Sequence, residues 1–225
     1  MAVAMRSQRL KIASLSEVFG DNDRMSDAYS PVPELNLLKQ LEGRIGGGNI
    51  SVGFHLGEFG RTVGIDTWSK DPAFLDSFHS FANANASGSI YAIWRVDDRT
   101  DLANLPVVVF GDEGGIGLVA RNLRELFRQL ACDKALYVGD FDAGFDDEDD
   151  PEEKDQEYDH HAEYVTWLEQ HFGLVPAENP NALVTAAEKQ FAARFANWVG
   201  RFVDDESFED DFMWEIKRLH DETDH

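Results

Sequence analysis

The glycine-rich stretch at residues 111–117 could do chemistry, because it carries two adjacent acids, Asp112 and Glu113, between apolar runs. A phosphate-binding loop needs Lys-Ser/Thr after its glycines, or glycines that open directly onto a helix. Here residues 116–120 form a separate apolar segment, and no basic residue occurs before Arg121. Both acids would also repel a phosphate. The pattern therefore favours a glycine turn between two strands.

Asp112 and Glu113 could alternatively be an acid–base pair. Catalytic carboxylates must converge on one bond at separations of about 5–9 Å, as in glycosidases. Side chains of adjacent residues usually point in different directions, so we expect two exposed turn acids instead. As surface acids they could still contact a binding partner.

The acidic stretch that begins at Asp140 resembles a calcium loop at its first and third positions, Asp140 and Asp142. A calcium loop also needs glycine at its sixth position and a bidentate glutamate at its twelfth. This chain has Phe145 and Pro151 there. The spacing favours weak divalent binding by many carboxylates over a specific calcium site.

Two further groups of side chains lack the neighbours that catalysis or metal binding requires. His160 and His161 are adjacent, so they cannot share one helical face, and no second His or Cys cluster is visible. Cys132, at the end of a predicted helix, has no visible base partner and is expected to be a packed thiol. We therefore predict no catalytic residue, no metal site and no cofactor.

The elements that position these residues follow from the hydrophobic periods. Residues 34–42 have leucines at helical spacing and are followed by Gly43, which predicts a short amphipathic helix. Residues 49–68 alternate apolar and polar positions around a glycine turn, so we expect a β-hairpin. Residues 71–85 begin with Asp71-Pro72 and carry phenylalanines at helical spacing, which predicts a helix on the sheet.

The central part of the chain predicts three more strands. Residues 88–97 are rich in β-branched and aromatic side chains, which predicts one strand. Residues 105–110 are apolar at nearly every position, which is typical of a central strand covered on both faces. Residues 116–120 form a short strand after the glycine turn.

Helices dominate the remainder. Asn122 is a predicted N-cap for residues 123–131, with Glu125 as its reciprocal capping partner. Helical periods return at residues 158–173, 180–203 and 208–219. We expect the tryptophans to be core aromatics: Trp68, Trp94, Trp167, Trp198 and Trp214.

Strands grouped before helices predict an α+β fold with a central, mostly antiparallel sheet flanked by helices and a C-terminal helical portion. We expect a single domain over residues 1–225, because nothing repeats at a fixed period. Within it, residues 139–157 are expected to form an acidic flexible loop, and residues 158–225 to form helices packed on the domain.

The formal net charge is −23, from 43 acids and 20 bases. Such a surface repels nucleic acid and anionic membranes and attracts basic proteins. The single cysteine precludes an intrachain disulfide, and no segment has the roughly 18 apolar residues of a membrane helix. The N-terminal stretch does not resemble a secretory signal. We therefore expect a cytoplasmic protein.

Two segments resemble a known family. They are WSKDPAFLDSFHSFANANASGSIYAIWRVDD from Trp68, and LPVVVFGDEGGIGLVARNLRELFRQLA from Leu105. Together they are similar to the SUKH superfamily, which includes a fungal cell-wall synthesis regulator and many bacterial immunity proteins. The shared features are a strand that ends in tryptophan, a PVVVFG-like strand, a glycine turn, a short strand, and a helix that begins Asn-Leu-x-Glu-Leu. They cover about a third of the chain and are structural rather than catalytic.

The resemblance implies a non-catalytic α+β domain that binds and neutralises a cognate bacterial toxin, often a nuclease. The acidic charge supports this independently, since nucleases present basic clefts. Two other functions remain open: a regulatory scaffold, and a hydrolase that uses carboxylates or a metal. The partner's identity and the oligomeric state stay open. Candidate partner-binding residues are Asp146, Asp147, Glu148, Asp149, Asp150, Glu152 and Glu153, with Asp112 and Glu113 near the contact.

Overall fold

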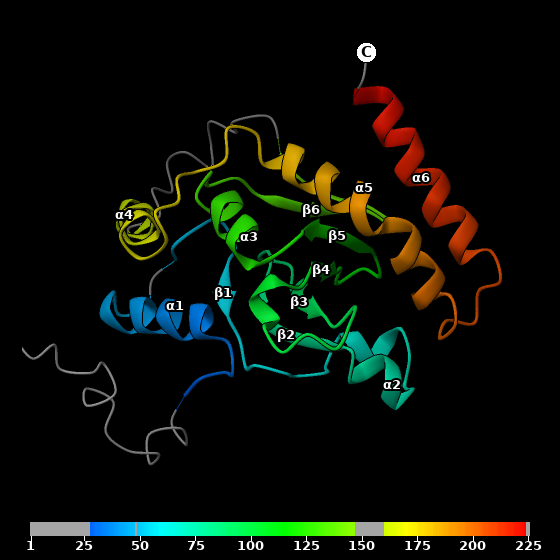
Figure 1. Cartoon of the computed structure of the whole chain (residues 1–225), viewed down its shortest axis with the longest axis horizontal. Helices are drawn as coiled ribbons and strands as arrows, with labels where there is room; N and C mark the ends of the chain where they lie inside the picture. The colour runs from blue at the N-terminus through cyan, green and yellow to red at the C-terminus, as the bar shows by residue number, and fades with distance from the viewer. Residues whose placement is uncertain (1–27, 48, 147–159, 224–225) are drawn as a thin grey trace, which may run out of the picture.

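The computed structural model describes residues 28–47, 49–146 and 160–223, with the side chains of 222 and 223 left out (Figure 1). These residues form one five-stranded antiparallel sheet with the strand order β1-β2-β3-β4-β5, and a separate two-stranded antiparallel sheet. The strands are β1 (His55–Leu56), β2 (Phe78–Asn83), β3 (Ile90–Trp94), β4 (Val107–Phe110), β5 (Ile116–Ala120), β6 (Leu136–Val138) and β7 (Ala143–Phe145).

Six α-helices accompany the sheets in the described residues, which confirms the α+β class and the C-terminal helical portion. α5 packs along β5 and contacts β7, and α6 lies beside α5 (Figure 1). None of these helices is long and apolar enough to cross a membrane. The helices are α1 (Pro33–Arg44), α2 (Pro72–Leu75), α3 (Leu123–Leu130), α4 (His161–Phe172), α5 (Pro180–Val199) and α6 (Phe208–Thr223), with the short 3-10 helices η2 (Ile65–Thr67) and η3 (Leu102–Asn104).

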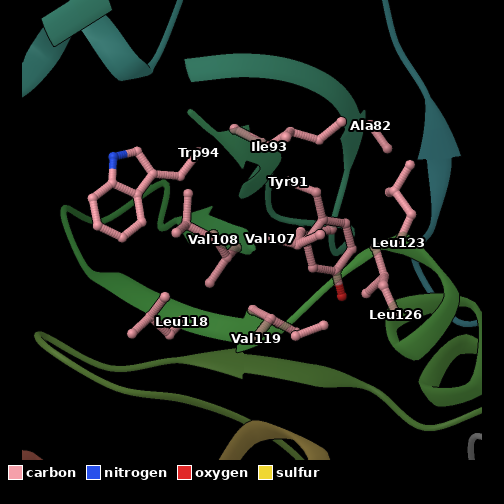
Figure 2. Close-up of a cluster of buried hydrophobic side chains, with 14 of the residues drawn as sticks. Ala82, Tyr91, Ile93, Trp94, Val107, Val108, Leu118, Val119, Leu123 and Leu126 are labelled. Atoms are coloured by element: carbon pink, nitrogen blue, oxygen red, sulfur yellow. The ribbon is translucent and has the colours of Figure 1, made fainter. Parts of the chain in front are cut away.

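The apolar strand β4 lies inside the sheet, between β3 and β5, as the sequence predicts. All its side chains are buried, and those of β5 are buried too. Figure 2 shows side chains of β3, β4, β5 and α3 gathered in one buried cluster. Burying a valine or leucine side chain contributes about 1.5–3 kcal/mol, so this cluster is the main stabilising element of the sheet.

The helix predicted over residues 71–85 is wrong beyond its first turn. Only α2 is helical, with Asp71 accepting a hydrogen bond from the Ala73 backbone, and β2 follows at once. The phenylalanines at 74, 78 and 81 fit a helical spacing in sequence. In the fold, Phe78 instead pairs with Trp94 of β3, because long-range strand pairing overrides local periodicity.

The hairpin predicted over residues 49–68 is also wrong. The only strand within these residues is β1, which pairs with β2, and Ile65–Thr67 is a 3-10 helix. Gly53, Gly60 and Gly64 have positive φ angles of 66°, 77° and 93°. Such conformations interrupt a strand, so the alternating side chains enter the core from irregular backbone.

The predicted caps of two helices form. The Asn122 side chain accepts from the Glu125 backbone N–H at 3.0 Å, and Asn179 caps α5. The Glu125 carboxylate, however, accepts from the backbone N–H of Arg121 rather than from that of Asn122. It also pairs with the Arg121 guanidinium, so the helix start is held by a variant of the expected capping box.

Two further expectations change. The acidic loop expected from residue 139 contains β7, which pairs with β6.

Among the tryptophans, Trp94 and Trp167 are buried and Trp68 and Trp198 are half-buried, but Trp214 on α6 is 64% exposed. Trp214 occupies the outer side of α6, because Phe208, Phe212 and Ile216 supply its buried side.

Candidate functional site

The glycine stretch at residues 111–115 is a turn between β4 and β5, as predicted. The Gly111 backbone N–H donates to the Gly115 carbonyl at 2.6 Å, and Gly114 has a φ of 107° that favours glycine. Asp112 and Glu113 are both exposed on this turn. The turn opens onto a strand and not onto a helix, so it lacks the geometry of a phosphate-binding loop.

Asp112 is held by the neighbouring turn between β2 and β3. One carboxylate oxygen accepts from the hydroxyls of Ser87 and Ser89, each at 2.8 Å. These hydrogen bonds lower the pKa of Asp112. A carboxylate with a lowered pKa is a weak proton acceptor, which fits a structural link between two turns better than acid–base chemistry. Glu113 makes no hydrogen bond or ion pair with any described residue.

Beside this turn lies a groove with a volume of about 490 Å³. Its walls come from four parts of the chain: the end of η2, the β4–β5 turn, the β6–β7 turn and the connection from α5 to α6. Figure 1 shows the α5–α6 connection at the opposite end of the molecule from α4. We call it the acidic groove; its lining residues are Thr67, Trp68, Gly114, Asp140, Phe141, Val203, Asp204, Asp205 and Phe208.

Three aromatic rings, together with Val203, form the apolar part of the acidic groove. Phe208 is almost fully buried and holds the other two by edge-to-face contacts. Its ring centroid lies 6.1 Å from that of Trp68 and 5.4 Å from that of Phe141. Trp68 and Phe141 are half-buried, so part of each ring remains available to a ligand.

Carboxylates form the rim of the acidic groove. Asp140 and Asp204 are exposed, and their carboxylates make no hydrogen bond or ion pair with any described residue. Asp205 differs, because it accepts from the backbone N–H and hydroxyl of Ser207 at 2.9 Å and so shapes the start of α6. Residues 204–211 contain six acids and no base. The rim therefore presents concentrated negative charge beside an aromatic surface.

The nearest bases in sequence already have partners elsewhere. Lys70, two residues after Trp68, donates to Asp66 at 2.8 Å. Arg201, which follows α5, donates to the Asn197 side chain at 2.8 Å. Neither residue lines the acidic groove, so the charge of its rim is not neutralised by the bases of the adjoining segments.

The acidic groove exists because two turns approach closely. The Ile116 backbone N–H donates to the Asp140 carbonyl at 3.1 Å, which places the β6–β7 turn against the start of β5. A Cβ atom at Gly115 would overlap the carbonyl oxygen of Gly139. Glycine at position 115 is therefore required for Asp140 and Phe141 to reach the groove.

Asp146 lies apart from Asp112 and Glu113, the two acids of the β4–β5 turn. β7 runs beside β5, with Asp140 hydrogen-bonded to Ile116 at one end and Phe145 hydrogen-bonded to Asn181 of α5 at the other. Asp146 follows Phe145 and is exposed, so it lies at the far end of β7 from Asp112 and Glu113. The remaining predicted acids fall outside the described residues: Asp147, Glu148, Asp149, Asp150, Glu152 and Glu153.

The other titratable groups singled out by the sequence serve packing. His161 Nδ1 lies 2.9 Å from the Ile50 carbonyl oxygen, and His160 pairs with Glu163. The Cys132 thiol is half-buried between the carbonyls of Arg128 and Ala177, and burial raises its pKa. Within residues 28–47, 49–146 and 160–221, no group of three or more His, Cys, Asp or Glu side chains has the arrangement of a metal site.

One buried pair had no sequence signal. Glu188 of α5 is buried, and its carboxylate lies 2.8 Å from Nε2 of His220 on α6. Burial raises the pKa of Glu188, and the nearby carboxylate of Asp142 adds to this effect. The two residues are 32 positions apart, so only the packing of α6 on α5 brings them together.

The residues of the acidic groove were also missed as a set. The run of acids at 204–211 was visible in the sequence, as was Phe208 at the start of a predicted helix. Trp68 was expected in the core, and Phe141 in an acidic loop. No local pattern indicates that these rings meet, because the meeting depends on contacts across the sheet.

The comparisons with known proteins leave the acidic groove to be interpreted from its own residues. No family model matches the chain, and no curated protein or solved structure matches it either.

Proposed function

We propose that this chain is a non-catalytic binding protein that neutralises a cognate basic toxin, as bacterial immunity proteins do, by stoichiometric blockade. The acidic groove is the site of contact in this proposal. A nuclease is the toxin class that fits best, because its basic cleft has the charge that complements this chain. The resemblance to the SUKH superfamily in the segments from Trp68 and Leu105 points to the same function.

The observation that carries the proposal is the combination of an aromatic surface with unpaired carboxylates in one concave place. Interfaces with high affinity contain aromatic anchors near their centre and a polar rim. Trp68 and Phe141 are half-buried rings of this kind. Asp140 and Asp204 form no ion pair within the described residues, so a cationic partner would break no existing pair to reach them.

The net charge of −23 supports the same proposal at long range. Electrostatic steering accelerates protein association to about 10⁸–10⁹ M⁻¹s⁻¹ at low salt, and the rate falls with ionic strength. Residues 147–159 hold nine acids and one lysine, so they supply much of this field wherever they lie. The groove then sets how slowly the complex dissociates.

The test is the growth of a bacterial host that expresses the protein encoded immediately beside this chain, with and without co-expression of this chain. Killing that this chain reverses supports the immunity function. A neighbour that is not toxic, or toxicity that this chain fails to relieve, contradicts it and favours a scaffold with several cellular partners.

Two matched variants test whether the toxin contacts the chain at the acidic groove. In Asp140→Lys/Asp204→Lys, the rim charge is reversed; in Glu169→Lys/Glu178→Lys, the same charge change is made at exposed acids outside the groove. We expect the first variant to lose protection and the second to retain it. Equal protection by both would show that the contact lies elsewhere.

A further inference from the structure

We propose that the acidic groove receives an arginine side chain of the partner, with its guanidinium between the aromatic rings and the rim carboxylates. This inference names the chemical group that the groove selects. It rests on the proposed function for its biological meaning. It follows from three properties of the groove: ring exposure, unpaired carboxylates and size.

The rings provide the flat surface that a guanidinium requires. Arginine stacks on aromatic faces by combined cation–π and planar contact, and tryptophan is the strongest such partner. Trp68 and Phe141 both line the groove and are both half-buried. Phe208 fixes them from beneath through edge-to-face contacts at 6.1 Å and 5.4 Å between ring centroids. The rings are therefore held in place before a ligand arrives.

The carboxylates provide the acceptors. Asp140 and Asp204 come from different connections, the β6–β7 turn and the α5–α6 connection, and both line the same groove. Neither carboxylate has a hydrogen-bond or ion-pair partner among the described residues. A guanidinium offers five N–H donors in a fixed plane, so it can satisfy acceptors on two sides while its face rests on a ring.

Arginine fits this site better than lysine or a metal ion. A lysine ammonium is a compact, strongly hydrated charge that gains less from a flat aromatic surface. A divalent ion needs several converging oxygen ligands, and the described residues form no such cluster. The volume of about 490 Å³ exceeds what one side chain fills, so the backbone next to the arginine also has room to enter.

The first experiment uses N-acetyl-arginine amide as the probe and N-acetyl-citrulline amide as its matched neutral analogue. Binding is followed in the full chain by NMR, through the indole N–H resonance of Trp68, which is assigned with Trp68→Phe. We expect the arginine probe to shift this resonance and to saturate at roughly millimolar concentration, because exposed ion pairs and ring contacts are individually weak. The citrulline probe should produce less than about a tenth of that shift.

The second experiment removes the carboxylates. Asp140→Asn/Asp204→Asn should weaken binding of the arginine probe by about five- to tenfold, as expected for two exposed ion pairs. The control Glu169→Gln/Glu178→Gln makes the same charge change outside the groove and should bind like the unmodified chain. Equal shifts with both probes, no shift at all, or no weakening in the first variant would each overturn the inference.

The outcomes separate this inference from the proposed function. If the arginine probe binds as expected but the chain does not relieve toxicity, the immunity function fails and the groove remains an arginine site. If toxicity is relieved but the probe does not bind at Trp68, the arginine inference fails and the immunity function stands.

Discussion

Two aspartates on neighbouring turns, Asp112 and Asp140, differ in what their carboxylates do. Asp112 accepts two hydroxyl hydrogen bonds and links two hairpin turns. The Asp140 carboxylate makes no hydrogen bond or ion pair with the described residues, and Asp140 lines the acidic groove. Both are exposed acids in glycine-rich stretches, so residue type and exposure do not distinguish them. The partners of the two carboxylates distinguish them: hydroxyls of another turn hold that of Asp112, whereas no described residue holds that of Asp140, which leaves it available to a partner.

The largest change in stability is expected from a substitution at Gly115, where the β4–β5 turn meets the β6–β7 turn. Gly115→Ala places a Cβ atom against the carbonyl oxygen of Gly139, which is backbone and cannot rotate away. We expect a loss of about 3 kcal/mol in the free energy of unfolding, the upper range for inserting an atom into a packed site. Urea denaturation measures it. Gly43→Ala is the control, because a Cβ there meets nothing within 4 Å. Gly43 lies near the end of α1, where alanine is the better helix former, so the free energy of unfolding should stay the same or rise by up to about 1 kcal/mol.

A smaller loss is expected at the structural aspartate. Asp112→Ala removes the acceptor of both serine hydroxyls, and we expect it to cost about 1–2 kcal/mol of unfolding free energy. Ser87→Ala/Ser89→Ala should cost a similar amount, and adding Asp112→Ala to that pair should then cost little more, since the same bonds are already lost. If urea denaturation showed that the losses from Asp112→Ala and from the two serine substitutions simply add, the proposed link between Asp112 and the serines would be contradicted.

The stabilisation by the hydrogen bonds between Asp112 and the two serines should weaken at low pH. The pKa of Asp112 is lowered in the folded state, so its contribution to stability is present above its ordinary value of 3.8. It is lost as the pH falls through the lowered pKa. We expect the difference in unfolding free energy between the chain and Asp112→Asn to shrink below about pH 4 and to stay constant between about pH 5 and 7. A difference that grows on acidification would contradict the assignment.

The acids beyond Asp146 act, in our proposal, on the rate of association. Replacing residues 146–157 by a Gly-Ser segment of equal length should slow association with the toxin by about tenfold at low salt and flatten its salt dependence. Stopped-flow mixing at several salt concentrations measures both. The dissociation rate should change little, because the groove residues remain. An unchanged association rate would remove the steering role.

The smallest effect is expected at the groove aspartates. Asp140→Asn/Asp204→Asn should alter the unfolding free energy by less than about 0.5 kcal/mol, because neither carboxylate bonds to a described residue. Urea denaturation beside Asp112→Ala gives the comparison directly. A loss as large as that of Asp112→Ala would mean that these acids stabilise the fold and are not reserved for a partner.

Elements with strong local signals could be predicted from the sequence. The buried strand β4, the glycine turn after it and the Asn122 cap each depend on residues within a few positions of one another. Between residues 49 and 85, only the first helical turn after Asp71 was assigned correctly, because alternating and helical spacings overlap there. Pairing with β3, and glycines with positive φ, decided the structure of this region.

The acidic turn at Asp112 was correctly recognised as a turn, but its two serine partners belong to another hairpin. The sequence likewise indicated an acidic binding protein without locating the site. Its predicted acids from Asp147 to Glu153 lie outside the described residues, and Asp146 lies at the end of β7 opposite to the turn that carries Asp112 and Glu113.

The amino-acid order alone establishes the class of the fold, the buried strand, the helix caps and the strong negative charge, because each reflects composition or the interaction of near neighbours. The acidic groove depends on the tertiary structure. Trp68, Asp140 and Phe208 are separated by about 70 residues from one to the next, and they meet only after β7 packs on β5 and α6 packs on α5. Side chains so far apart in the chain carry no joint pattern in sequence, since their proximity comes from the packing of the whole domain.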